Sequence, residues 1–137
     1  MNPPFQELSY ATRRMIVADK EALKEFGFTY SQWTFMVYVA HNQPTTLVAI
    51  ARYYMINNSA ITTIKKKFLD KGYIEEVTGT DQREKKVSLT PSGEREYYRI
   101  NQKIREMEKK FFHALSTKEL AQLQEMLYRI NTEGFTP

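Results

Sequence analysis

The sequence predicts a mainly helical single domain, residues 1–137, with one small β-hairpin. Apolar side chains recur at helical spacings over most of the chain, and two Thr/Ser-x-x-Gln/Glu capping boxes mark helix starts. β-Type residues that flank a polar segment cluster between 73 and 89. A length of 137 residues with 42% hydrophobic and 26% charged residues suits one compact, folded domain.

Two helices are expected in the first third of the chain. The first spans about 5–25 and ends where Gly27 breaks its apolar pattern. The second begins at the capping box formed by Thr29 and Gln32. It ends before Pro44, because the residue before a proline is disfavoured in the helical conformation.

A pair of short, closely joined helices follows. The third helix has Thr45 or Thr46 as its cap, and the turn at 56–59 holds two asparagines and a serine, which favour turns and helix caps. The fourth helix is expected from Ser59 to Lys71. Gly72 suits a left-handed conformation just after its end.

A β-hairpin is expected over 73–89, with a long charged tip between its strands. Thr90 and Pro91 then predict the start of a fifth helix over about 92–114.

A second capping box, Ser116 to Glu119, starts a sixth helix. Apolar residues on the last two helices repeat at spacings of three and four, the seam of helices that pack along their length. The seam residues are Tyr97, Ile100, Ile104, Met107 and Phe111 on the fifth helix, and Leu123 and Leu127 on the sixth.

Charge and composition narrow the classes of function that the chain could have. Eight basic and five acidic side chains lie in 45–93, so this segment supplies +3 of the net charge of +4, which favours a polyanionic partner. The chain has no cysteine, which excludes disulfides and thiolate chemistry. It has no apolar run of the roughly 18 residues that a membrane span needs and no signal-peptide pattern, so we expect a soluble, cytoplasmic protein.

A short helix, a tight turn, a second helix and a hairpin in this order are the winged helix-turn-helix arrangement, in which the second helix can enter the major groove of DNA. At 100° per residue, Ile61, Ile64 and Phe68 form the buried stripe of the fourth helix. Short hydroxyls and a lysine on the remaining face can bond base edges and phosphates. The positions predicted to contact the major groove are Ser59, Thr62, Thr63 and Lys66.

The hairpin tip adds a second predicted contact. Arg83 suits the narrow minor groove, where the negative potential is strongest, and Asp81 can fix its guanidinium by a charge-assisted hydrogen bond. Lys85 stands behind this tip. An isolated charged hairpin is usually only a solvated turn, so this interpretation depends on the helix-turn-helix that precedes it.

The residues that carry these features resemble the MarR family of bacterial transcription regulators over about 29–93. The match includes a D-x-R wing followed by an L-T-x-x-G exit. It rests on Ile50-Ala51, Ile56, Ser59, Ile61-Thr62, Ile64, Phe68, Lys71-Gly72-Tyr73-Ile74, Asp81-Gln82-Arg83 and Val87 to Gly93.

The resemblance implies a winged-helix DNA-binding core at about 29–93 and a helical dimerisation region at about 1–26 and 93–137. It implies a homodimer that binds a pseudo-palindromic operator on double-stranded DNA and acts as a ligand-released repressor. This sequence departs from the family pattern at Lys65, where an aliphatic residue is usual, and at 53–55, where Tyr-Tyr-Met replaces a polar residue, leucine and glycine.

Family members commonly release DNA when a small aromatic acid or phenol enters a cleft between the dimer region and the winged helix. Aromatic residues on helices are more often plain core. The residues available for such a cleft are Tyr30, Trp33, Tyr38, Tyr53, Tyr54, Phe111 and Phe112.

The sequence leaves three alternatives to a DNA-binding regulator. An enzyme is disfavoured, because the chain has no cysteine, no phosphate-cradling glycine loop and two histidines far apart, so we assign no catalytic residue, cofactor or metal. A metal-responsive regulator would use His41 or His113 with Glu106 or Glu108. A winged helix that docks proteins and binds no DNA is the third alternative.

Overall fold

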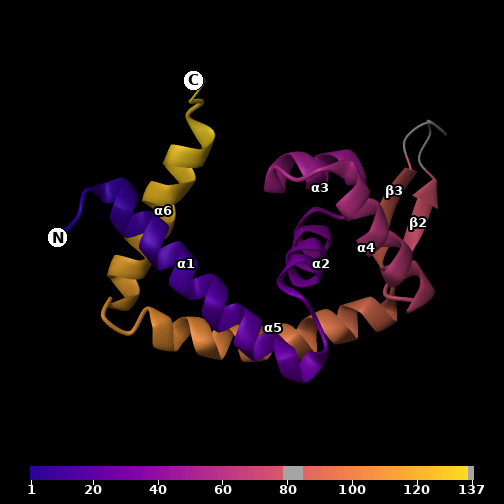
Figure 1. Ribbon diagram of the computed structural model, residues 1–137, viewed down its shortest axis with the longest axis horizontal. Coiled ribbons are helices and arrows are strands. Elements are labelled where there is room, and N and C mark those ends of the chain that lie inside the picture. The colour runs from indigo at the N-terminus through magenta and orange to yellow at the C-terminus, as the bar shows by residue number, and fades with distance from the viewer. Residues whose placement is uncertain (79–84, 136–137) are drawn as a thin grey trace.

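The computed structural model describes residues 1–78 and 85–135. It confirms the predicted class, mainly helical with a small antiparallel sheet (Figure 1). Among these residues, no helix is both long enough and apolar enough to cross a membrane. The elements are α1 (Pro4–Leu23), the 3-10 helix η1 (Lys24–Phe26), α2 (Tyr30–Asn42), β1 (Thr45–Thr46), α3 (Leu47–Tyr54), α4 (Asn58–Asp70), β2 (Ile74–Thr78), β3 (Lys85–Leu89), α5 (Pro91–Phe111) and α6 (Thr117–Thr132).

Both predicted capping boxes are present. The Thr29 hydroxyl accepts a hydrogen bond from the Gln32 amide at 3.1 Å, and the Gln32 side chain accepts one from the Thr29 amide at 3.0 Å. Ser116 and Glu119 make the same two bonds at the start of α6, at 3.1 and 2.8 Å. Each box satisfies two amides that a helix start leaves unpaired, so local sequence sets where α2 and α6 begin.

The sheet has one strand more than the sequence predicts. Thr45–Thr46 pairs antiparallel with Val87 and Lys86, which gives the strand order β1-β3-β2. A strand of two residues shows no alternation in a sequence. Its position depends on a partner about 40 residues away, so no local pattern predicts it.

Two helix boundaries also differ. α4 begins at Asn58 rather than Ser59, because the Asn57 side chain is the cap and accepts from the Ala60 amide at 3.0 Å. α5 ends at Phe111, before the expected end near residue 114.

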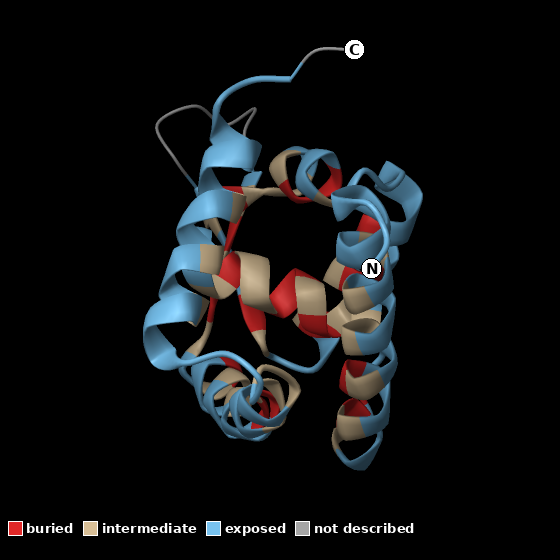
Figure 2. Cartoon of the chain, turned by 90° about the vertical axis from the view of Figure 1, so that its left-hand side faces the viewer, coloured by how far each residue is buried: buried red, intermediate tan, exposed pale blue. Residues whose placement is uncertain are grey.

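The core lies where α2, α3, α4 and the sheet meet, with α1 and α5 closing one side. In Figure 2 the buried positions occupy the inward faces of the helices, and exposed positions cover the outside. The predicted stripe of Ile61, Ile64 and Phe68 is buried. The largest fully buried side chains beside it are Leu23, Phe35, Met36, Val39, Ile50, Val87 and Ile100.

Part of the predicted dimer seam packs inside one chain, and this corrects the sequence-based assignment. Ile100 and Ile104 are buried in the same core as Leu23, so neither offers a surface to a second chain. Tyr97 stacks on Trp33, with ring centroids 5.5 Å apart. The periodicity predicted burial correctly, but it does not distinguish burial within a chain from burial between chains.

The far end of the molecule has little core of its own. Figure 1 shows α5 running from the winged helix to α6, with α1 across it and both termini near α6. No residue of α6 is buried. The other four predicted seam residues, Met107, Phe111, Leu123 and Leu127, are half-buried.

Candidate nucleic-acid interface

The outward face of α4 is fixed by its ends and by its buried stripe. Asn57 caps the first turn and also accepts a hydrogen bond from the Ser59 hydroxyl at 2.7 Å. The turn before it passes through Met55 with φ of +55°, a left-handed conformation that lets α3 and α4 follow closely. Because one side of α4 is buried, the opposite side must face solvent.

All four residues predicted for the major groove lie exposed on α4: Ser59, Thr62, Thr63 and Lys66. The hydroxyl of Thr62 donates to the Asn58 carbonyl at 2.8 Å, and that of Thr63 donates to the Ser59 carbonyl at 3.1 Å. With their protons used inside the helix, both threonine oxygens remain acceptors. They can accept from base amino groups, and their methyl groups can contact thymine.

A two-bond helix end joins α4 to the wing. The Tyr73 amide donates to the Phe68 carbonyl at 2.9 Å, and the Gly72 amide donates to the Leu69 carbonyl at 3.0 Å. Gly72 has φ of +75°, as this Schellman motif requires. The motif therefore fixes the direction in which β2 leaves α4.

Gly93 keeps the wing against α5. A Cβ at this position would stand 2.0 Å from the Tyr73 carbonyl oxygen, so only glycine fits. Thr90 caps α5 through the Gly93 amide at 3.0 Å, and the Thr90 amide donates to the same Tyr73 carbonyl. The L-T-x-x-G exit therefore holds the end of the wing against the start of α5.

Lys65 forms an ion pair with the wing. Its ammonium lies 2.9 Å from a carboxylate oxygen of Glu76 on β2, and its side chain is mostly buried. The hydrogen bond from Lys65, together with its charge, lowers the pKa of the Glu76 carboxyl. The departure from the family pattern thus links α4 to the wing by an ion pair.

Of the three residues predicted for the wing, the structure describes only Lys85. Asp81 and Arg83 lie outside the described residues. Lys85 begins β3, is exposed and stands opposite Thr78 of β2. The strands on both sides of the tip are paired as predicted.

Gln43 is a structural residue that sequence reasoning missed. Its side-chain oxygen accepts from the Leu89 amide at 2.8 Å and from the Ser88 hydroxyl at 3.1 Å. Its amide nitrogen donates to Glu94 at 2.9 Å. These bonds tie the end of α2 to β3 and α5. The sequence identifies Gln43 only as the end of a helix before a proline.

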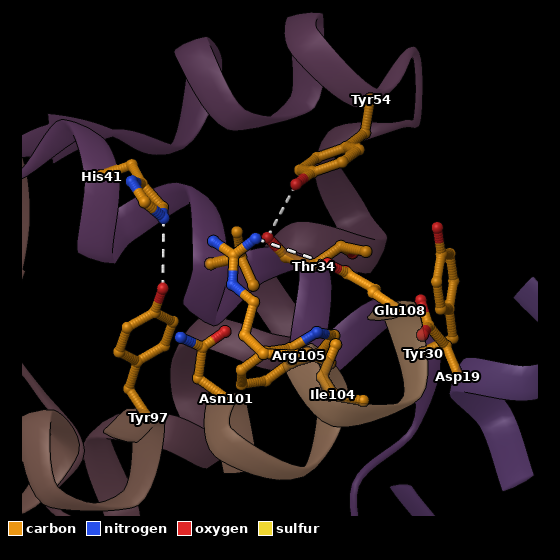
Figure 3. A pocket seen from close by; sticks show the side chains of 12 residues that line it. Asp19, Tyr30, Thr34, His41, Tyr54, Tyr97, Asn101, Ile104, Arg105 and Glu108 are labelled. Carbon is orange, nitrogen blue, oxygen red and sulfur yellow. Dashed lines mark hydrogen bonds and ion pairs between the residues drawn. The ribbon is translucent and has the colours of Figure 1, made fainter. Parts of the chain in front are cut away.

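A cavity of about 280 Å³ lies between α1, α2, α3 and α5 (Figure 3). Three of the aromatic residues predicted for a cleft line it, namely Tyr30, Trp33 and Tyr54, and Tyr97 joins them. The other four do not line it. Tyr38 and Tyr53 pack on each other, with centroids 5.1 Å apart, and both contact Tyr54. Phe111 and Phe112 form a second pair, 5.0 Å apart.

Most polar groups around this cavity have partners. Figure 3 shows His41 bonded to the Tyr97 hydroxyl at 3.1 Å and Tyr54 donating to the Thr34 carbonyl at 2.8 Å. Arg105 pairs with Glu108 at 3.3 Å. Burial raises the pKa of the Tyr30, Tyr54 and Tyr97 hydroxyls.

Asp19 of α1 is buried without a partner for one of its oxygens in the described part of the chain. It is 8% exposed, and its Oδ1 has no hydrogen-bond partner among the described residues. Burial raises the pKa of this carboxyl to about 6, with a smaller contribution from the charge of Glu108. No sequence signal indicated it, because an acidic residue in an amphipathic helix usually faces water.

The structure does not assemble the predicted metal ligands. Across 1–78 and 85–135, no group of three or more His, Asp or Glu side chains is placed to hold an ion. His41 is bonded to Tyr97, and His113 is exposed beyond the end of α5.

Comparison with known proteins supports the fold. No protein-family model matches this chain. It is 28% identical over 104 residues to the uncharacterized HTH-type transcriptional regulator YwoH of Bacillus subtilis (strain 168), a match that covers 76% of each chain.

Solved structures match over nearly the whole chain. Wild-type MarR of E. coli in its apo form has a TM-score of 0.79 at 18% identity, covering 95% of this chain and 98% of that chain. The MarR family protein Rv2887 of Mycobacterium tuberculosis, solved in complex with DNA, has a TM-score of 0.77 at 16% identity and covers 96% and 100%. Its complex with p-aminosalicylic acid has a TM-score of 0.78.

The match extends from the winged helix through α1, α5 and α6, beyond the segment over which the sequence resembles the family. The chain therefore has the MarR-type winged helix-turn-helix fold.

Proposed function

We propose that this protein is a sequence-specific, double-stranded DNA-binding transcription regulator that uses α4 as its reading helix. The observation that carries the proposal is the exposed face of Ser59, Thr62, Thr63 and Lys66, opposite the buried stripe. Short side chains on that face let the helix approach base edges closely. The relatives include a protein named as a transcriptional regulator and a fold neighbour solved with DNA.

Charge supports DNA over a protein partner. The winged-helix segment 45–93 carries most of the net positive charge, and Lys85 and Lys86 stand at the base of the wing. Arg83 at the tip is proposed to enter the minor groove, with Asp81 orienting it.

Homodimerisation is part of the proposal. α6 buries no residue within one chain, and an apolar groove of about 420 Å³ between α5 and α6 is lined by Phe112, Leu120, Leu123 and Leu127. A second copy supplies the missing apolar cover. Two copies related by a twofold axis present two α4 helices, which suits a pseudo-palindromic operator.

Repression relieved by a small ligand completes the proposal. The cavity lies where α1 and α5 meet α2 of the winged helix, so a molecule inside it contacts both regions. Rv2887 has been solved with p-aminosalicylic acid, which supports ligand binding within this fold.

The test of DNA binding is selection of duplexes from a random pool, followed by affinity measurement across salt. A protein that neutralises about six phosphates loses on the order of a thousandfold in affinity between 50 and 200 mM salt. A selected sequence with this steep slope is the expected result. If no duplex is enriched and a protein partner binds with little salt dependence, the docking alternative replaces this proposal.

Two lysine variants localise the interface. Lys66→Ala should weaken operator binding about tenfold at low salt and reduce the salt slope by about one, because one phosphate or base contact is lost. Lys118→Ala removes the same charge from an exposed position on α6, outside the winged helix. It should change neither the operator affinity nor the salt slope. Equal losses in both variants would show a net-charge effect rather than contact by α4.

A further inference from the structure

The charges around the cavity leave Asp19 without a counter-ion. Glu108 is already paired with Arg105 on its own helix, and His41 is held by Tyr97. Asp19 is more than nine-tenths buried, lines the cavity and has an unbonded oxygen. A buried carboxylate without a partner is costly, and a cation placed beside it would lower that cost.

The rest of the wall suits the hydrocarbon part of such a cation. Trp33 and Tyr97 stack with an interplanar angle of 16°, and Tyr30 and Tyr54 lie on other sides of the space. Aromatic faces attract ammonium groups and pack against rings. Figure 3 shows Asp19, Tyr30 and Glu108 at one end of the cavity and His41 and Tyr97 at the other, so an ammonium group would lie at the first end.

We propose that the cavity binds a small aromatic amine as its ammonium ion, with Asp19 as the counter-ion. This inference rests on the proposed ligand-released function and names the class of ligand. An aromatic carboxylate of the same size would meet Asp19 as a like charge in a buried site and should be rejected.

Protons should compete with the amine. Since the pKa of Asp19 is raised to about 6, the carboxyl is charged at neutral pH and becomes neutral below that value. Amine affinity should therefore be constant between about pH 7 and about pH 9, where the amine keeps its own proton, and fall towards tenfold per pH unit below about pH 5. The other titratable and charged groups around the cavity are Tyr30 and His41 from α2, Tyr54 from α3, and Tyr97, Arg105 and Glu108 from α5.

The test uses three probes of similar size and different charge: 2-phenylethylamine, 2-phenylethanol and 3-phenylpropanoate. Trp33 is the single tryptophan of the chain and lines the cavity, so its fluorescence reports binding in the free protein. The amine should bind at least tenfold more tightly than the alcohol, and the acid most weakly. Equal binding of all three, or tightest binding of the acid, would overturn the proposal.

Two variants test whether Asp19 is the group that recognises the amine. Asp19→Asn should reduce the preference for the amine over the alcohol to within about twofold and remove the pH dependence. Glu21→Gln, an exposed carboxyl on the same helix, should change neither. If Asp19→Asn does not fold, the probe series and the pH profile of the natural protein still decide the question. A preference retained in folded Asp19→Asn contradicts the assignment.

The two proposals fail separately. Amine binding without any operator binding supports the cation site and contradicts the regulator. Operator binding with no selective response of Trp33 to the amine supports the regulator and contradicts the cation site. When both hold, the amine added to the protein–operator complex should release the DNA, and Asp19→Asn should stay bound.

Discussion

Asp19 shows how one buried side chain can reduce the stability of the fold. Its folded-state pKa of about 6 lies above its ordinary value of 3.8. Between these two values the folded protein holds a proton that the unfolded chain has released. The free energy of unfolding therefore falls as the pH rises through this window, and the cost is complete at neutral pH.

Asp19→Asn should consequently stabilise the protein at pH 7 by up to about 3 kcal/mol, because the amide carries no charge to desolvate. At pH 4 most Asp19 in the folded protein is protonated, so most of the gain should disappear. Urea denaturation at both pH values measures the difference. A gain of equal size at pH 4 and pH 7 would show that packing, rather than charge, is responsible.

At the scale of elements, the turn between α3 and α4 carries a strained residue. Met55 adopts φ of +55° and is 92% exposed, so its side chain gains little packing in return. A left-handed conformation costs a residue with a Cβ about 1–2 kcal/mol, and glycine avoids this cost.

Met55→Gly should therefore raise the free energy of unfolding by up to about 1 kcal/mol, after the greater freedom of glycine in the unfolded chain is counted. Arg52→Gly provides the contrast. Arg52 is exposed in the last turn of α3 with no positive φ, so glycine there should cost about 1 kcal/mol. Thermal melts of the two variants should shift in opposite directions, and shifts of the same sign would contradict the strain at Met55.

Local signals account for most of what the sequence predicts at this scale. The caps at Thr29 and Ser116 and the stripe at Ile61 depend on residues within one or two turns, so they are readable without a structure. β1 depends on partners about 40 residues away, and the bridge made by Gln43 depends on partners 45 to 51 residues away. Nothing near them in the chain encodes those contacts.

The candidate site likewise has one part that the sequence predicts and one part that it does not. The α4 face follows from helical spacing alone, and all four predicted residues lie on it. The cavity cannot be predicted from helical spacing, because it forms only where α1 and α5 pack against α2. Asp19 is ordinary in its own helix and unusual only in that packing.

At the scale of the whole molecule, the exposed apolar surface of α6 predicts self-association. Leu127→Glu should convert the proposed dimer to monomer, because a carboxylate in the groove between α5 and α6 would have to be desolvated against apolar side chains. Gln122→Glu adds the same charge on α6 at an exposed position outside that groove and should stay dimeric. Sedimentation velocity distinguishes the two, and a dimer in both variants would place the interface elsewhere.

Because Gly93 lies so close to the Tyr73 carbonyl, a rotation of α5 would move the wing with it. The 21 residues of this helix extend for roughly 30 Å. If one end pivots by about 5°, the other end moves by about 3 Å, which is the length of one hydrogen bond. Because Gly93 has no side chain to separate α5 from Tyr73, a small change in helix tilt would move the wing and, under the proposed function, change its distance from the minor groove.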